Sequence, residues 1–210
     1  MAARKNFDLS IYFVADPHAC GGRDIAEVVM AAAKGGVTMV QLRNKIDPKP
    51  LVAAQAAMLC ELLKPYNIPF LVNDYVDIAR DAGADGAHIG QGDITPAEAR
   101  KILGENAILG LTAFTEEHIS AVDSAKVDYI GTGPFFPTQT DKGKPVLGAE
   151  KFAALIKSSP VPVVGIGGIT TDNARQVLDA GADGLAMMRA ISAANDPCEA
   201  ARKFAKLMER

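Results

Sequence analysis

The stretch AGADGA at residues 82–87 returns almost unchanged as AGADGL at residues 180–185, and KGGV at 34–37 is a looser copy. Each copy follows a segment with helical apolar spacing and precedes a short run rich in β-formers. A glycine at such a place is predicted to end the helix in the left-handed conformation. The copies therefore mark equivalent helix-to-strand corners of a repeated βα unit.

The same alternation extends outward from these corners over the whole chain. Strands are predicted at 11–15, 38–43, 69–73, 86–90, 107–112, 127–131, 162–167 and 183–188, and helices near 24–34, 48–64, 76–82, 96–103, 115–124, 149–157, 171–180 and 197–208. Threonines at 95, 115 and 171 are expected to cap helices. Eight units in 210 residues leave about 26 residues each, which predicts a compact (β/α)8 TIM barrel forming one domain over residues 1–210. A doubly wound open sheet is the alternative, because the number of strands does not establish closure.

Composition excludes several classes of protein. The chain is 49% hydrophobic and carries 22 Lys and Arg against 25 Asp and Glu, a net charge of −3 that argues against a nucleic-acid partner. No apolar run approaches the ~18 residues of a membrane span, and no signal peptide is expected. Three scattered cysteines indicate neither a disulfide framework nor a thiolate zinc site. We expect a cytoplasmic protein with no membrane partner, and the sequence leaves assembly into a homo-oligomer open.

In such a barrel the reacting groups lie at the carboxyl ends of the strands. Strand alternation sends Gln41, Arg43 and Lys45 to one side of the second strand end, where a solvated charge cluster is the simpler alternative. Asp74 follows the third strand and Asp93 the fourth. Carboxylates at neighbouring strand ends suit Mg²⁺, so these two residues are the predicted metal ligands.

Two nearby residues receive structural interpretations. Asp77 is predicted to support the start of a helix, because it precedes a helical apolar pattern. His88 lies within the fourth strand and is expected to be a hydrogen-bonded core or supporting histidine rather than a catalytic one.

A second anion site is predicted across the barrel mouth. The stretch GIGGIT at 165–170 follows the seventh strand and is expected to open a helix. Loops after strands seven and eight commonly bind phosphate, so the backbone N–H groups of Gly167 and Gly168 are predicted donors, with a tight turn as the alternative. The long loop at 131–145 is expected to be a mobile flap over an anionic ligand. Two facing anion sites suggest a transfer between two phosphorylated small molecules.

Several stretches together resemble the thiamine phosphate synthase family, in order and over nearly the whole chain. They are QLRNK at 41–45, NDYVDIA at 73–79, HIGQGD at 88–93, DYIGTGP at 128–134 with TQT at 138–140, and VGIGGI at 164–169. That family has a (β/α)8 fold. It joins hydroxymethylpyrimidine diphosphate to thiazole phosphate, which releases diphosphate and forms thiamine phosphate.

The resemblance implies a role for each matching position. Asp74 and Asp93 would hold Mg²⁺ on the diphosphate, and Gln41 would contact the pyrimidine. The remaining contacts would be Arg43, Lys45 and Asn73 to the diphosphate, and Thr138, Thr140, Gly167 and Gly168 to the thiazole phosphate. Metal and cations would stabilise the departing diphosphate, and the thiazole nitrogen would then attack without a protein nucleophile.

Three departures from the family pattern add candidate residues. Thr112 keeps a hydroxyl where the family commonly has serine, whereas Phe114 replaces its histidine. Asp141 stands where a lysine is common, and the neighbouring Lys142 could restore the charge. Arg189 stands where the family usually has a serine, and an arginine at the phosphate end could compensate for Asp141. Thr112, Lys142 and Arg189 therefore join the expected substrate contacts, with Arg43, Lys45 and Thr112 as catalytic groups.

Two other functions remain as alternatives. A thiazole tautomerase of the same barrel family would need an acid–base side chain. Such relatives have a histidine in the loop after the sixth strand, where this chain has Pro134, and they lack the paired aspartates. A non-catalytic relative that binds phosphate ligands would keep the site and lose turnover.

Overall fold

Eight parallel strands pair in chain order, and the last pairs with the first, so the sheet closes on itself. The structure is a computed structural model that describes residues 5–140, 143 and 145–208. Asp141 and Lys142 therefore lie outside the described residues. The strands are β1 (Ile11–Ala15), β2 (Met39–Leu42), β3 (Phe70–Asn73), β4 (Gly86–Ile89), β5 (Ile108–Thr112), β6 (Tyr129–Thr132), β7 (Val163–Ile166) and β8 (Gly184–Met187). The predicted (β/α)8 barrel is confirmed, and the open sheet is excluded.

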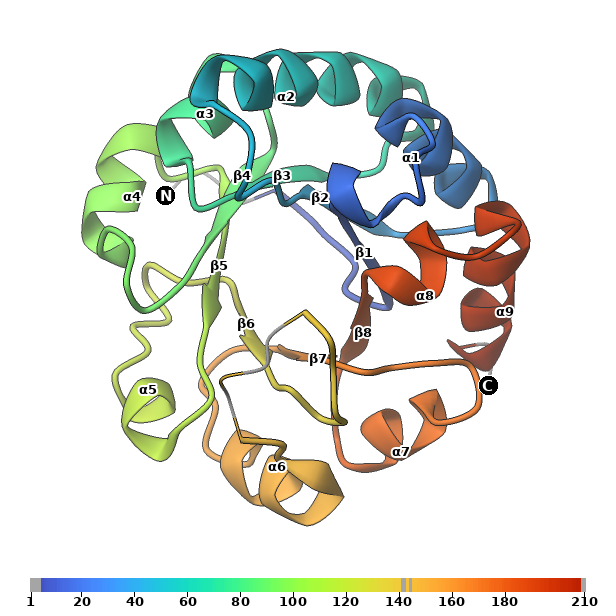
Figure 1. Cartoon of the computed structure of the whole chain (residues 1–210). Helices are drawn as coiled ribbons and strands as arrows, with labels where there is room; N and C mark the ends of the chain where they lie inside the picture. The colour runs from blue at the N-terminus through green and yellow to red at the C-terminus, as the bar shows by residue number, and fades with distance from the viewer. Residues whose placement is uncertain (1–4, 141–142, 144, 209–210) are drawn as a thin grey trace.

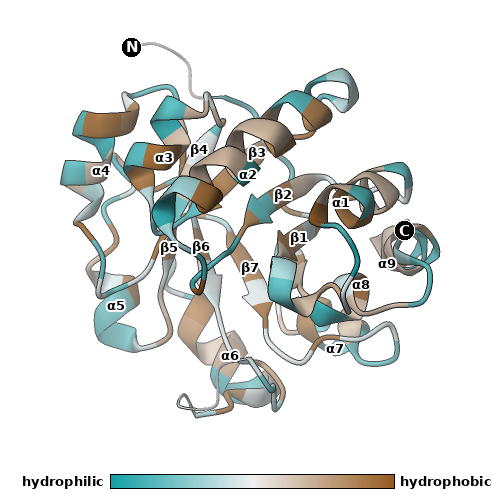
Figure 2. Cartoon of the chain, turned by 45° about the horizontal axis from the view of Figure 1, so that its top comes forward, coloured by the Kyte–Doolittle hydropathy of each residue, from teal (hydrophilic) through white to brown (hydrophobic). Residues whose placement is uncertain are grey.

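Helices surround the ring of strands (Figure 1). They are α1 (Ile25–Lys34), α2 (Lys49–Leu63), α3 (Val76–Asp81), α4 (Pro96–Leu103), α5 (Glu116–Ser120), α6 (Gly148–Ile156), α7 (Ala174–Asp179), α8 (Arg189–Ser192) and α9 (Pro197–Met208), with short 3₁₀ turns η1 (Pro17–Ala19) and η2 (Lys64–Tyr66). Hydrophobic and hydrophilic residues alternate along the outer helices (Figure 2), as expected where one helix face packs on a barrel. None of the described helices is long and apolar enough to cross a membrane.

Two predicted helices are shorter than expected. Thr95 and Thr115 cap α4 and α5 as predicted. α5 nevertheless ends at Ser120, because a turn closed on the carbonyl of Asp123 follows it. The cap predicted at Thr171 is wrong, because Asn173 occupies the N-cap position of α7 and its side chain closes the preceding loop by accepting from the N–H of Thr170 at 2.8 Å.

The glycines of the repeated stretches are required by the backbone geometry at the amino-terminal end of the barrel. Gly83 and Gly181 have φ of 69° and 99°, the left-handed conformation predicted for them. The next glycine of each repeat begins a strand where a side chain has no room. A Cβ at Gly86 would lie 1.8 Å from the carbonyl oxygen of Ile108, and one at Gly184 would lie 1.9 Å from that of Leu9.

The aspartates of the repeat close the same end of the barrel. The residue before each even-numbered strand accepts a hydrogen bond from a backbone N–H in the first two residues of the preceding strand. The pairs are Thr38 with Ile11 at 2.9 Å, and Asp85 with Phe70, Asp128 with Leu109 and Asp183 with Val163 at 2.7 Å each. Backbone donors that the helices do not cover are thereby satisfied, so this end of the barrel serves stability.

Apolar side chains fill the barrel in two layers. One layer lies between strands and helices, and the other lies inside the ring of strands. The inner layer includes Tyr12, Met39, Leu71 and Tyr129, each at most 1% exposed. The barrel interior is therefore packed, and a ligand cavity can form only above this layer.

Candidate functional site

A cavity of about 760 Å³ opens at the carboxyl ends of the strands, and each of the eight strands contributes to its walls. Eleven of the predicted site residues line it: Gln41, Arg43, Lys45, Asn73, Asp74, Thr112, Thr138, Thr140, Gly167, Gly168 and Arg189. Asp93 is not among the residues that line the cavity; it acts on Asp74 from the loop after β4, where its Oδ2 accepts from the N–H of Gly90 at 2.7 Å. Lys142 lies outside the described residues. The structure thus brings together the charged strand ends and the glycine turn in one space.

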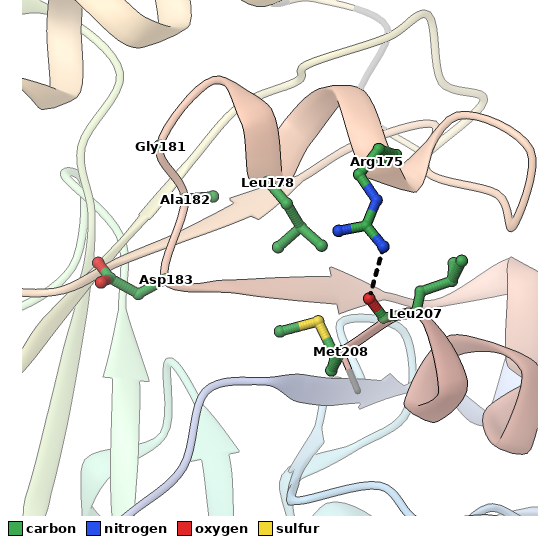
Figure 3. A pocket seen from close by; sticks show the side chains of 7 residues that line it. All are labelled: Arg175, Leu178, Gly181, Ala182, Asp183, Leu207 and Met208. Carbon is green, nitrogen blue, oxygen red and sulfur yellow. Dashed lines mark hydrogen bonds between the residues drawn. The ribbon is translucent and has the colours of Figure 1, made fainter. Parts of the chain in front are cut away.

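A second, smaller cavity lies beside the start of β8 (Figure 3). It has a volume of about 320 Å³ and lies between α7 and the end of α9. Arg175 crosses it and donates to the carbonyl oxygen of Leu207 at 3.0 Å. This position is at the amino-terminal end of the barrel, where the closing hydrogen bonds of the repeat lie, so we assign it no part in the reaction.

Two carboxylates and a lysine form the first feature of the main cavity. Lys45 Nζ lies 3.0 Å from Asp74 Oδ2. Burial raises the pKa of Asp74; Lys45 opposes that rise, and the nearby Asp93 adds to it. Asp74 also has a φ of 64°, a left-handed conformation that aspartate tolerates better than most residues. Asp74 is largely buried, whereas Asp93 and the counter-charge Lys45 are exposed. Two neighbouring carboxylates of this kind are a donor set that suits a hard divalent cation.

The two carboxylates do not form a complete metal cage. Within the described ranges, no three His, Cys, Asp or Glu side chains gather at metal-binding distance. Mg²⁺ commonly takes one or two carboxylates and completes its shell with water and substrate phosphate. The residues therefore fit a magnesium ion that arrives with a phosphorylated ligand.

Asn73 presents a donor to the same space. Its side-chain Nδ2 is buried and has no hydrogen-bond partner among the described residues. A buried N–H₂ group without a partner costs free energy unless a ligand or water satisfies it. Asn73 lines the cavity beside Asp74, so an anionic ligand there would supply the missing acceptor.

Asp16 is a site residue that the sequence analysis missed. It follows β1, and its Oδ2 lies 2.9 Å from Arg43 Nη1, while its Oδ1 accepts from the N–H of His18. Both charged side chains are largely buried, at 12% and 23% exposure. Asp16 therefore holds the Arg43 guanidinium in one direction at the cavity wall. A polar residue directly after the first strand was the signal that could have identified it.

Replacing Asp16 by alanine is expected to lower turnover by about five- to tenfold, because Arg43 would lose the partner that orients it. Steady-state kinetics with the proposed substrates below would measure the loss. Asp8→Ala is the matched control, since Asp8 closes a turn at the other end of β1. Wild-type kinetics in Asp16→Ala would show that Arg43 needs no such support.

The loop between β6 and α6 is anchored at its start, and its expected mobility as a flap stays a prediction. Phe135 is 1% exposed and packs against Phe152 at 5.0 Å between ring centroids. The N–H groups of Phe135 and Phe136 donate to the carbonyls of Ile166 and Gly167. The first half of the loop therefore extends the pairing of β6 with β7, and its phenylalanines serve as anchors.

Gln139 and Thr140 of this loop lie beside the residues that follow β8. The Thr140 hydroxyl lies 3.8 Å from Met188 Sδ, and Arg189 Nη1 lies 3.3 Å from Gln139 Oε1. Gln139 and Met188 line the cavity and were not predicted. Arg189 is the first residue of α8. This helix has four residues, too few for an apolar periodicity that would predict a helix.

The glycine turn after β7 packs tightly beneath the loop. A Cβ at Gly167 would lie 2.6 Å from Pro134 Cα, and one at Gly168 would lie 2.5 Å from the carbonyl oxygen of Pro137. The expectation that the turn opens a helix is wrong, because α7 begins only at Ala174. The tight-turn role is confirmed, and phosphate binding by the two amides stays a proposal.

Three further side chains that the sequence singled out are Asp77, His88 and Phe114. Asp77 lies in the first turn of α3, as predicted. His88 is buried and contacts Tyr129 Oη and Thr112 Oγ1, which confirms a hydrogen-bonded core histidine. Phe114 lines the cavity and stacks edge-on against His118 at 4.7 Å.

The closed barrel and the cavity at the carboxyl ends of its strands define a (β/α)8 barrel protein with a candidate small-molecule site in the position usual for barrel enzymes. The model of the thiamine monophosphate synthase family matches residues 11–191. The chain belongs to this family.

Individual relatives agree over the full length. A thiamine-phosphate synthase of Azorhizobium caulinodans is 44% identical over 205 residues, covering 97% of this chain and 96% of that protein. One of Albidiferax ferrireducens is 43% identical over 203 residues, covering 96% and 92%. A solved thiamine phosphate pyrophosphorylase of Pyrococcus furiosus superposes with a TM-score of 0.86 at 33% identity, covering 96% of each chain.

Proposed function

We propose that this chain condenses hydroxymethylpyrimidine diphosphate with thiazole phosphate, in the presence of Mg²⁺, to give thiamine phosphate and diphosphate. The observation that carries the proposal is the juxtaposition in one cavity of the Asp74–Lys45 pair and the glycine turn after β7. Family membership and the names of the full-length relatives support the same reaction.

The diphosphate binds at the ends of β2, β3 and β4. Arg43 and Lys45 supply positive charge, and the unpartnered Asn73 amide donates to a phosphate oxygen. Asp74 and Asp93 would hold Mg²⁺, and the ion would supply positive charge that makes the diphosphate a better leaving group. Lys45 is the counter-charge of Asp74 in the structure, and its exposed ammonium can turn to the diphosphate when a cation takes that place.

The thiazole phosphate binds on the facing wall. The Gly167 and Gly168 amides, the Thr138 and Thr140 hydroxyls and Arg189 are the groups that meet it. The carbon–oxygen bond to diphosphate breaks first, so the leaving oxygen takes the electron pair and the amino-pyrimidine delocalises the positive charge on the methylene carbon. The thiazole nitrogen then attacks that carbon. The protein contributes orientation and charge stabilisation, and it needs no nucleophile of its own.

The direct test mixes both substrates with Mg²⁺ and measures thiamine phosphate and diphosphate. We expect equimolar products and their loss in excess EDTA. Binding of both ligands without product would favour the non-catalytic alternative. Isomerisation of a thiazole substrate without the pyrimidine would favour the tautomerase. Product that persists in EDTA would remove the metal role of Asp74 and Asp93.

Arg189→Ala is expected to raise the KM for thiazole phosphate about tenfold with a smaller change in kcat, because Arg189 is the cation that α8 presents to the phosphate wall. Titration of both substrates separates the two constants. Lys101→Ala on the outer face of α4 is the control for lost charge. An unchanged KM for thiazole phosphate would rule this role out.

The small phosphorylated substrates are the proposed partners, with no nucleic acid or membrane. Cys20, Cys60 and Cys198 are free thiols, which suits the proposed cytoplasmic location. Assembly into a homo-oligomer stays open.

A further inference from the structure

A chain of hydrogen bonds crosses the barrel interior beneath the cavity. Tyr12 on β1 and Tyr129 on β6 are at most 1% exposed, and their hydroxyl oxygens are 2.7 Å apart. Gln41 Nε2 donates to Tyr12 Oη at 2.5 Å. At the other end, His88 places Nδ1 3.0 Å from Tyr129 Oη and Nε2 3.0 Å from Thr112 Oγ1. The chain therefore joins Gln41 to Thr112, two residues that line the cavity.

Two glycines leave room for this chain. A Cβ at Gly110 would lie 2.2 Å from Tyr129 Cζ and 2.5 Å from His88 Nδ1. A Cβ at Gly131 would lie 3.2 Å from His88 Cε1. Glycines on the adjacent strands β5 and β6 therefore leave the space in which the His88 and Tyr129 rings meet. Because a side chain at Gly110 would clash with these rings and one at Gly131 would crowd them, the polar contact depends on the two glycines.

The direction of each bond follows from the Gln41 Nε2 donor at one end, because the other bonds of the chain can run either way. A phenol has one proton, and burial raises the pKa of Tyr12 and Tyr129 far enough to keep both protonated. Tyr12 accepts from the Gln41 amide and gives its own proton to Tyr129. Tyr129 in turn gives its proton to His88 Nδ1. The His88 ring then carries its proton on Nε2 and donates to Thr112 Oγ1.

We propose that His88, Tyr129 and Tyr12 are positioning residues that hold His88 as the neutral Nε2–H tautomer and thereby turn the Thr112 hydroxyl proton toward the ligand. Thr112 accepts from His88, so its own proton is available to an anion in the cavity. The inference rests on the proposed function for the identity of that anion, the departing diphosphate. The tautomer itself is a property of the free protein.

The same chain couples the two walls of the cavity. If the Gln41 amide turns over, Tyr12 must donate to its oxygen, and every later bond reverses. Thr112 would then donate to His88 and lose its donor for the ligand. A group that accepts from the free N–H of Gln41 or donates to its oxygen therefore selects the polarity of Thr112 from across the barrel.

The first test reads the tautomer by ¹⁵N NMR of protein labelled at histidine. His18→Gln and His118→Gln assign the signals by difference. We expect neutral His88 with its proton on Nε2 at pH 7.5, and a loss of that single tautomer in Tyr129→Phe, which keeps the ring and removes the hydroxyl. A proton on Nδ1, or on both nitrogens, in the wild-type protein would overturn the proposal.

The second test is a double-mutant cycle on turnover. Tyr129→Phe is expected to lower kcat about fivefold with less than a twofold change in either KM. In a Thr112→Val background, the same change should have no further effect, because the donor it orients is already gone. Thr112→Ser should restore the sensitivity to Tyr129→Phe. Equal losses in both backgrounds would show that Tyr129 acts only through packing and would overturn the proposal.

The two tests separate this inference from the proposed function. If the wild-type protein forms no thiamine phosphate, the proposed function fails, whereas the NMR result still decides the tautomer. If product forms and the wild-type tautomer is wrong, the proposed function stands and the inference fails.

Discussion

Replacing Asp74 by asparagine is expected to lower turnover at least tenfold (about 1.4 kcal/mol) while leaving the fold as stable as before or more so. Asparagine keeps the shape and removes one charged ligand of the proposed ion. It also tolerates the left-handed φ of 64° at this position. Asp93→Asn is expected to lose at least as much activity. Turnover with both substrates at saturating Mg²⁺ measures the effect.

The stability half of this prediction follows from the direction of the pKa shift. The folded-state pKa of Asp74 is raised, chiefly by burial. An ionised carboxylate with a raised pKa costs stability at neutral pH, and asparagine removes that cost. The exposed Lys45 partner contributes little. We expect Tm to rise by up to about 2 °C.

Asp77→Asn is the matched control, because Asp77 is exposed in the first turn of α3 and pairs only loosely with Lys49 at 3.7 Å. It should keep both activity and Tm. An Asp74→Asn protein with wild-type turnover would contradict the site. A protein that loses activity together with a large part of its stability would instead show a structural role for Asp74.

Arg100→Ala is expected to cost about 3–5 kcal/mol of unfolding free energy, the loss typical when one partner of a buried ion pair is removed. Arg100 and Asp128 are 4% and 5% exposed, and Nη2 lies 2.5 Å from Oδ2. Arg100 also donates to the carbonyl oxygens of Lys126 and Ala107. The substitution would leave a buried carboxylate and two buried carbonyls without these donors. Urea unfolding at pH 7 measures the loss.

Arg80→Ala provides the comparison, because Arg80 forms an exposed pair with Asp81 on α3. Its cost should stay below about 0.5 kcal/mol. A cost for Arg100→Ala below about 1 kcal/mol would mean that the pair adds little to the barrel. The hydrogen bond that Asp128 accepts from the N–H of Leu109 would then be the main stabilising contact of Asp128.

The fold could be predicted because the repeated stretches contain glycines whose backbone conformation ends a helix before the next strand. Gly83 and Gly181 had to end helices, and the strands that follow begin within a few residues. The reason for the aspartate in each copy was not readable, because it lies in a hydrogen bond to the neighbouring strand. The bounds of β1 are those predicted, and the bounds of the other strands differ from the predicted ones by at most two residues. The ends of α5 and α7 were harder to predict, because turn hydrogen bonds compete with helix hydrogen bonds over few residues.

The site was predictable where chemistry and position coincide. Charged residues at strand ends, such as Arg43 and Asp74, have no reason to be buried in a core and therefore stood out. Tyr12 and Tyr129 did not, because a tyrosine inside a strand resembles any other core aromatic until its hydroxyl partner is seen. Asp16 was missed because its role depends on a contact across strands.

The central claim is that one cavity holds a metal-bound diphosphate opposite a second phosphate. Its most direct test is a crystal structure of the protein with Mn²⁺, diphosphate and thiamine phosphate, examined by anomalous scattering. The account predicts one manganese peak between Asp74 and Asp93, diphosphate against Arg43, and the thiamine phosphate group at the Gly167–Gly168 turn. Manganese elsewhere, or a phosphate bound away from both walls, would contradict it.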